Sequence, residues 1–123
     1  MKIRVHTDLD VYKKAFRAAQ EIFRITSTFP KEECYSLSDQ IRRSSRSVCA
    51  NIAEAFRKRK YPKSFISKLS DSEGEAAETQ VWIQFAFSCD YLKRDDCERL
   101  YKEYNNIIGK LVNMSSKPEN WTL

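Results

Sequence analysis

Apolar residues recur along the chain at intervals of three and four, which is the spacing of one face of an α-helix. Four segments have this pattern, and they predict helices over residues 8–28, 36–60, 62–92 and 95–114. The remaining residues, 115–123, are polar with one tryptophan and predict a loosely docked tail. Because the connections are short, neighbouring helices should run antiparallel. We therefore expect an all-α protein, an up-down antiparallel four-helix bundle that forms a single domain over residues 1–123.

Local signals fit these boundaries. Residue types that cap helix N-termini stand at the expected starts: Asp8, Ser36 or Ser38, and Asp95. Pro62 suits the first turn of a helix, and Pro30 should end the first helix because the residue before a proline avoids helical geometry. Two glycines and three prolines are too few for an all-β fold, which needs frequent turns.

Each predicted helix has one stripe of apolar or small residues that should face the core. In the first helix this stripe contains Tyr12, Phe16, Ala19, Phe23 and Thr26, widened by Ala15, Ile22 and Phe29. In the second it contains Leu37, Ile41, Ser44, Val48, Asn51 or Ile52, and Ala55. The serines and alanines of the second helix predict close approach of a neighbouring helix.

The third helix has its inner stripe at Phe65, Leu69, Ser72, Ala76, Thr79, Ile83 and Ala86. A second apolar stripe appears late in this helix, around Val81, Trp82 and Phe85. A helix that is apolar nearly all round is buried on more than one side, and a small bundle covers only one. We therefore expect Val81, Trp82 and Phe85 to form a subunit interface. The alternative is a monomer with a few exposed aromatic residues, which are ordinary on protein surfaces.

Charged residues on the second and third helices should meet when the chain folds back at Tyr61. Arg43 and Arg46 then come within one turn of Glu75 and Glu78, and Glu54 can reach Lys68 or Arg57. Arginine suits two-point pairing with carboxylates. We interpret six residues as a structural ion network that fixes the register of helices or subunits: Arg43, Arg46, Asn51, Glu54, Glu75 and Glu78.

The net charge of +5 and the pI near 9.1 suggest an acidic partner such as nucleic acid. Cations crowd the turn between the second and third helices, at Arg57, Lys58, Arg59, Lys60 and Lys63. A basic turn with an exposed tyrosine, Tyr61, can hold phosphates and stack a base. The competing interpretation is a solvated loop that aids solubility, since many helical proteins are mildly basic.

Residues typical of catalysis or of metal binding are scarce. The one histidine, His6, lies in a predicted N-terminal arm and is expected to be a surface residue, and the four cysteines show no C-x-x-C spacing. We expect a protein that is not an enzyme and holds no metal or cofactor. The chain opens without an apolar run typical of a signal peptide, and no stretch approaches about 20 apolar residues. A cytoplasmic location without a membrane span is therefore expected.

Four sequence motifs resemble a known family. They are F-P-x-x-E at 29–33, Q-I-R-R at 40–43, S-V-C-A-N-I-A-E-A-F at 47–56, and L-S-D-S-E-G-E-A-A-E-T-Q at 69–80. Together they resemble the four-helix bundle family of 23S rRNA intervening-sequence proteins, over about Leu9 to Val112. This chain has Cys49 where the family usually has proline and Ala55 where it usually has glycine, so the middle of the second helix should be straighter.

The resemblance implies a ring-shaped homopentamer. It extends to the accessory subunits of diversity-generating retroelements, which are basic pentamers that engage nucleic acid and a reverse transcriptase. Residues and resemblance together predict a non-enzymatic oligomeric bundle that binds RNA or DNA without sequence preference through its basic turn. The alternative is a protein-interaction scaffold or accessory subunit with no direct nucleic-acid contact. The resemblance also suggests a protein partner such as a reverse transcriptase.

Overall fold

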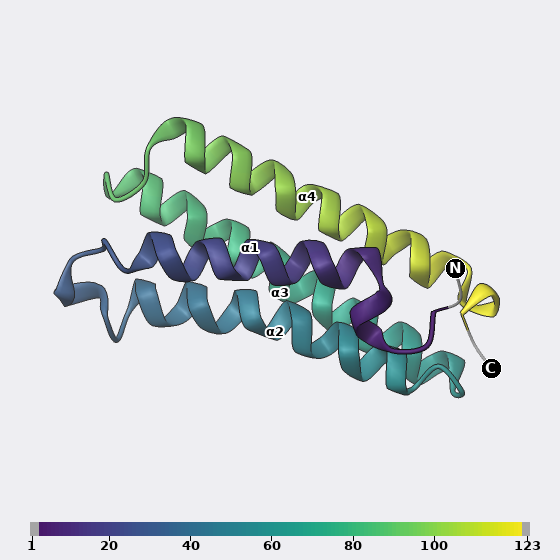
Figure 1. Ribbon diagram of the computed structural model, residues 1–123. Helices are drawn as coiled ribbons and strands as arrows, with labels where there is room; N and C mark the ends of the chain where they lie inside the picture. The colour runs from purple at the N-terminus through teal and green to yellow at the C-terminus, as the bar shows by residue number, and fades with distance from the viewer. Residues whose placement is uncertain (1–2, 122–123) are drawn as a thin grey trace.

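The computed structural model describes residues 3–121, and it contains four long helices packed side by side (Figure 1). The helices are α1 (Asp10–Thr26), α2 (Leu37–Arg57), α3 (Pro62–Ser88) and α4 (Arg94–Ser116). Short 3-10 turns flank them at η1 (His6–Asp8), η2 (Lys31–Glu33) and η3 (Pro118–Asn120). Each helix packs on its sequence neighbours, and α1 also packs on α4. The expected all-α, up-down four-helix bundle is confirmed.

The two ends of the bundle are built from different segments. The turn between α2 and α3 lies at the same end as both chain termini, whereas the α1–α2 loop and the α3–α4 turn lie at the opposite end (Figure 1). The expected tail is partly structured, because α4 continues to Ser116 and Trp121 packs against the core. Within the described part of the chain, every helix is too short or too polar to cross a bilayer.

The prediction that the third helix reaches residue 92 was wrong. Asp90 adopts a positive φ of 63°, which ends α3 at Ser88. The Asp90 N–H donates to the Phe87 carbonyl at 3.0 Å, and the Tyr91 N–H donates to the Ala86 carbonyl at 2.9 Å. These two bonds form a Schellman motif, which satisfies the last carbonyls of a helix and reverses the chain. Aspartate tolerates the left-handed conformation better than most residues.

The expected capping roles of Asp8 and Asp95 were also wrong. α1 begins after Leu9 and α4 begins after Lys93, and neither boundary residue has a side-chain cap. The carboxylate of Asp8 instead accepts hydrogen bonds from the backbone N–H groups of Arg4 and Val5, at 3.0 and 3.3 Å. Asp8 therefore fixes the N-terminal arm (residues 3–9) and does not cap a long helix.

The core-facing side of α1 differs from the predicted stripe. Phe16 and Phe23 are 46% and 47% exposed, although we expected them in the core. The buried face of α1 is rotated away from the centre of the predicted stripe. It consists mainly of smaller residues: Val11, Ala15, Ala18, Ile22 and Thr26. The apolar arc of α1 is wider than the core can cover. Packing at close helix separation favours the edge with small side chains, which leaves the aromatic edge at the surface.

The predicted stripe of α2 and the inner stripe of α3 are buried. They meet in one core whose largest fully buried members include Phe65, Ile52, Ile83 and Tyr104. Between α2 and α3, small side chains permit close packing and two buried hydrogen bonds. The Ser72 hydroxyl donates to the Val48 carbonyl at 2.9 Å, and the Thr79 hydroxyl donates to the Ser44 hydroxyl at 2.8 Å. These bonds fix the register of α2 against α3.

We expect Thr79→Val to lower the free energy of unfolding by about 1 kcal/mol, because the buried Ser44 hydroxyl loses its partner. The double variant Ser44→Ala, Thr79→Val should cost less than the sum of the two single variants, since both polar groups then disappear together. Urea denaturation followed by circular dichroism measures all three. Strictly additive costs would show that the two hydroxyls are not coupled.

At the end opposite the termini, Glu33 ties the α1–α2 loop to the α3–α4 turn. Its carboxylate accepts a hydrogen bond from the Tyr91 hydroxyl at 2.9 Å and another from the Leu37 N–H at 3.2 Å. The bond from Tyr91, followed by that from Leu37, lowers the pKa of Glu33 below its ordinary value. Phe29 packs on the Tyr91 ring with centroids 5.3 Å apart.

This contact predicts a pH-dependent loss of stability. Because the folded protein lowers the pKa of Glu33, its stabilising contribution is present above the ordinary value of 4.5 and is lost as pH falls below it. Glu33→Gln should therefore lower the Tm at pH 7, and its difference from wild type should shrink towards pH 3. Thermal melts across this range measure the effect. A difference that stays constant with pH would contradict an ionic role for Glu33.

Candidate nucleic-acid interface

Five cations crowd the turn between α2 and α3 because the chain reverses there within a few residues. We call them the basic end: Arg57, Lys58, Arg59, Lys60 and Lys63. α2 ends at Arg57, and the Tyr61 N–H closes the turn on the Lys58 carbonyl at 2.9 Å. Tyr61 is extended because it precedes Pro62, which begins α3. The local sequence thus places every charge of this run on one short surface.

Some of these side chains are held in place while others project freely. The Arg59 guanidinium lies 3.7 Å from the centroid of the Phe56 ring, and its Nε donates to the Phe56 carbonyl at 2.9 Å. The Lys60 ammonium is 6.0 Å from the ring of Tyr61, which is exposed. Among residues 3–121, none of the five cations of the basic end forms an ion pair.

Glu54 is the acid closest in sequence to the basic end, and it is engaged elsewhere. Its carboxylate pairs with the Lys68 ammonium of α3 at 2.8 Å, as the predicted register requires. The same ammonium lies 3.8 Å from Asp71. The Lys68 contact lowers the pKa of Glu54, and in turn Glu54 raises the pKa of Lys68. The Glu54 carboxylate is therefore already matched and leaves the basic end unneutralised.

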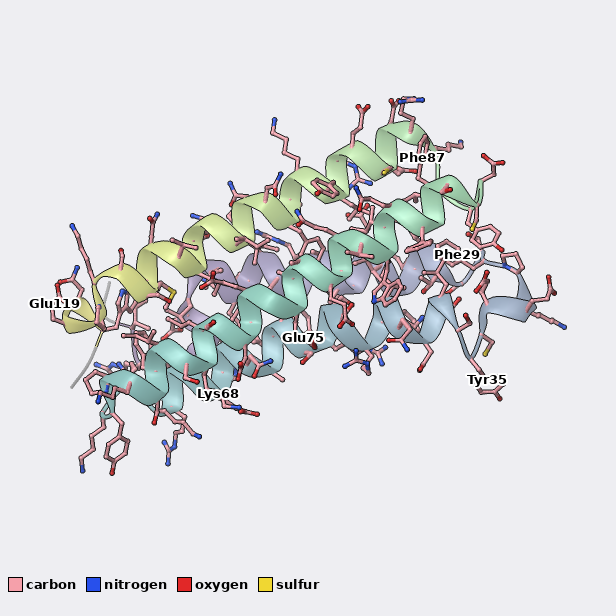
Figure 2. All side chains as sticks on the ribbon, turned by 180° about the vertical axis from the view of Figure 1, so that it is seen from behind. Phe29, Tyr35, Lys68, Glu75, Phe87 and Glu119 are labelled. Atoms are coloured by element: carbon pink, nitrogen blue, oxygen red, sulfur yellow. The ribbon has the colours of Figure 1, made fainter. Side chains whose placement is uncertain are left out.

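The arginine and glutamates midway along the bundle also meet as expected. The Arg43 guanidinium lies 2.7 Å from the Glu78 carboxylate and 3.7 Å from that of Glu75. The Trp82 indole N–H donates to the same Glu78 carboxylate at 3.2 Å. Figure 2 shows Lys68 near one end of α3 and Glu75 near its middle, both on the side of α2. These pairs link α2 to α3 within one chain.

Arg46 and Asn51 do not join this network, so their predicted intrachain pairing was wrong. Arg46 lies over the Phe23 ring of α1, 5.6 Å from its centroid. Asn51 donates to the Ser47 carbonyl of its own helix at 3.0 Å. Side chains three positions apart on a helix point in directions that differ by about 60°. Arg46 is therefore directed towards α1, whereas Arg43 faces α3.

Arg42 shares the aromatic surface of α1 and was missed by the sequence interpretation. Its guanidinium lies 4.6 Å from the Phe23 centroid, and its Nε donates to the Thr26 hydroxyl at 2.6 Å. Beside it, a shallow groove of about 410 Å³ runs between α1 and α2. We call it the α1 groove, and its lining includes Tyr12, Phe16, Ala19, Phe23, Arg24, Arg46 and Cys49.

The late stripe of α3 is a second apolar surface. Val81 and Phe85 are 42% and 53% exposed, and Trp82 is half-buried beside Phe85. Gly74 is exposed on the same helix, seven residues before Val81, with no side chain of its own chain near its Cα. We call Val81, Trp82 and Phe85 the α3 stripe. The described residues of one chain leave it open.

The N-terminal arm contributes further cations to the end that carries the basic turn. Arg4 and His6 lie beside Arg57 and Arg59 around a small cavity. The sequence interpretation did not single out Arg4, and it assigned His6 to the surface. The arm has no helical periodicity, so no pattern in the sequence indicated that it folds back onto α2.

No cluster typical of enzyme chemistry accompanies these surfaces in the described residues. Within 3–121, no three histidine, cysteine, aspartate or glutamate side chains are grouped to hold a metal ion. Burial raises the pKa of the Cys49 thiol to about 11, so this cysteine is a core residue and a poor nucleophile. What the arrangement offers is a set of unpaired cations at one end and two apolar surfaces along the sides.

Comparisons with known proteins agree with the fold and the motifs. The family model described as 23S rRNA-intervening sequence protein matches residues 7–113. A search of curated proteins finds no match. A similar solved structure is that of a protein of unknown function from the S23 ribosomal protein family of Bacteroides thetaiotaomicron. It is 28% identical, covers 86% of this chain and 95% of its own, and has a TM-score of 0.78. The chain therefore belongs to the family of 23S rRNA-intervening sequence proteins.

Proposed function

We propose that this protein is a non-enzymatic oligomer that binds RNA or DNA through its basic end, with little preference for sequence. One observation carries the proposal: the basic end holds five cations and no acid within residues 57–63, whereas the rest of the chain has equal numbers of cations and acids. The excess positive charge is therefore concentrated at one end of the bundle and is free to meet phosphates.

Binding of this kind follows from electrostatics. Cations that neutralise phosphates release condensed counterions, and this release drives association without reading the bases. The exposed ring of Tyr61 stands within the basic end and offers a stacking surface for one base. The short turn offers no helix or strand long enough to enter a groove, which is consistent with low sequence preference.

Oligomerisation is supported by two apolar surfaces that do not overlap. The α1 groove lies between α1 and α2, and the α3 stripe lies on a helix diagonal to α1 in the bundle. A contact between two different surfaces of the same chain is head-to-tail, and it closes into a ring when the rotation between subunits completes a circle.

A ring would repeat the basic end around its axis. We propose a homopentamer, as the family resemblance implies. Weak phosphate contacts on several subunits then add by multivalency, and the overall affinity exceeds that of one subunit by far. The four free cysteines fit a reducing compartment, and we place the protein in the cytoplasm.

The experiment that tests the proposal is a fluorescence-anisotropy titration of the purified full chain. Unrelated RNA and DNA oligonucleotides of equal length serve as probes, at about 50 and 200 mM salt, on protein whose mass is known from light scattering. We expect micromolar binding to every probe and a steep loss of affinity at the higher salt. Absence of binding at low salt would refute the proposed function.

The apolar surfaces favour one second candidate, a protein-interaction scaffold without direct nucleic-acid contact. In that case the ring would present its surface to a protein partner, and the basic end would aid solubility. A protein that assembles but does not bind any oligonucleotide would favour this candidate. A reverse transcriptase gene or an rRNA insertion next to the coding sequence would favour nucleic-acid binding.

A further inference from the structure

The N-terminal arm and the end of α2 enclose a small cavity at the same end of the molecule as the basic turn. Its volume is about 190 Å³, and four of its lining residues carry nitrogen donors: Arg4, His6, Arg57 and Arg59. The rest of the lining comes from Val5, Ala53 and Phe56. Arg4 and His6 are separated from the arginines of α2 by about fifty positions in sequence, so only the fold brings these donors together.

Contacts within the chain hold both walls of this cavity. The Asp8 carboxylate accepts hydrogen bonds from the backbone N–H groups of Arg4 and Val5, which fixes the course of the arm. The His6 ring packs edge-on against Tyr12, with centroids 4.8 Å apart. On the other wall, Arg59 is fixed on Phe56 by the stacking and by its Nε hydrogen bond. The backbone of the arm, the His6 ring and the Arg59 guanidinium are therefore held in place in the folded chain.

The charge of this cavity is offset only in part from within the chain, by the attraction between Asp8 and Arg4. Arg4, Arg57 and Arg59 form no ion pair with a carboxylate in the described range of residues. Asp8 is the acid of the arm, and its carboxylate is occupied by the two backbone N–H groups, which lower its pKa. Arginine pairs with phosphate through two parallel N–H bonds, so the chemistry of this lining selects an anion with several oxygens.

The size of the cavity decides which anion fits. Pockets for whole drug-sized ligands or nucleotides measure about 300–1,000 Å³, so this cavity is too small for a complete nucleotide and suits a single tetrahedral group. We propose that it is a binding site for one phosphate group, and that in the complex this group belongs to the backbone of the bound nucleic acid. The second part of this statement rests on the proposed function; the first part does not.

Two probes separate the sources of the phosphate. Inorganic phosphate and dimethyl phosphate, a model of the nucleic-acid backbone, are titrated into the 15N-labelled full chain, and the NMR signals of Arg59 Nε and the His6 ring are followed. We expect saturable shifts of both signals with either probe. Arg4→Gln and Arg59→Gln should each weaken this binding about tenfold, because each removes a charge-assisted contact.

Lys102→Gln is the matched control, since Lys102 is exposed on α4, lies outside the basic end and does not line the cavity. It should change phosphate binding less than twofold. Arg4→Gln lies outside the helices and leaves the core intact, so it keeps the test valid even if Arg59→Gln perturbs the turn. Equal losses in Arg4→Gln and Lys102→Gln would overturn the site, because they would show a diffuse effect of net charge.

Failure of the site and failure of the proposed function give different results. Absence of saturable shifts with both phosphates overturns the site, even if oligonucleotides still bind to the basic end. Saturable shifts combined with no oligonucleotide binding support the phosphate site and refute its link to nucleic acid. Competition between dimethyl phosphate and an oligonucleotide, lost in Arg4→Gln, supports both parts of the proposal.

Discussion

Phe85→Asp and Phe16→Asp are each expected to convert the proposed oligomer to monomers, and an equimolar mixture of the two variants is expected to form a 1:1 heterodimer. Phe85 belongs to the α3 stripe and Phe16 to the α1 groove, and both rings are about half exposed in one chain. In a head-to-tail contact, each variant loses one surface and keeps the other. The two intact surfaces of a mixture can then pair once, and the assembly stops at two subunits.

The expected effect is large because a carboxylate would replace an aromatic ring at the centre of an apolar contact. Truncation of a central aromatic residue alone commonly costs 2 kcal/mol or more, and an unpaired buried charge adds to this cost. We expect subunit affinity to fall by at least about a hundredfold, which light scattering coupled to size exclusion detects as a change in mass. Circular dichroism should show an unchanged helix content.

Tyr35→Asp is the matched control, because Tyr35 is 95% exposed in the α1–α2 loop and belongs to neither the α3 stripe nor the α1 groove; it lies at the end of the bundle opposite the basic end (Figure 2). The mass of the Tyr35→Asp variant in solution should equal that of the wild-type protein. A soluble Phe85→Asp variant of unchanged mass would show that the α3 stripe is not an interface. If each variant is monomeric but their mixture remains monomeric, the contact pairs identical surfaces and the head-to-tail arrangement is refuted.

Neutralising three cations of the basic end should have the second large effect. We expect affinity to depend less steeply on salt in the triple variant Arg57→Gln, Arg59→Gln, Lys60→Gln. The magnitude of the slope of log affinity against log salt concentration should fall by about 2 to 3 for each subunit that contacts the oligonucleotide. Each lost phosphate contact contributes about 0.7 for single strands and about 0.9 for duplex DNA. The affinity at about 50 mM salt should fall by roughly a hundredfold, and anisotropy titrations at several salt concentrations measure both quantities.

A second triple variant separates a local effect from one of net charge. It combines Lys31→Gln, Lys93→Gln and Lys102→Gln, which remove three exposed cations away from the basic end. Its net charge equals that of the triple variant of the basic end. The salt slope of this variant should stay close to that of wild type. Unchanged binding in the variant of the basic end, or equal losses in both variants, would show that nucleic acid does not contact the basic end.

The register of α2 against α3 could be predicted from the sequence because the turn between them is short and bounded by Pro62. Folding the chain at Tyr61 was enough to bring Glu54 to Lys68 and Arg43 to Glu78, at 2.8 and 2.7 Å. The basic end followed from the same turn. These features depend on helical periodicity and on a local chain reversal, and both are determined by residues that are close together in the sequence.

The buried face of α1 could not be predicted in the same way. Its apolar residues span a wide arc, and periodicity alone does not say which edge of such an arc meets the other helices. The structure buries Ala15 and Ala18 and leaves Phe16 and Phe23 exposed, because the close approach of α2 and α4 favours small side chains. The position of Arg46 over Phe23 follows from that choice.

The sequence by itself determined the helices, their order, the up-down arrangement and the place of the basic end, since each depends on contacts between residues close in the chain or on one short turn. The tertiary structure alone decided which aromatic residues remain exposed on α1 and where the N-terminal arm lies. It also brought Arg4 and His6 to Arg57 and Arg59. These features arise from contacts between segments that are distant in the sequence. Such segments compete for a limited core, and local sequence does not indicate which residues are buried in it.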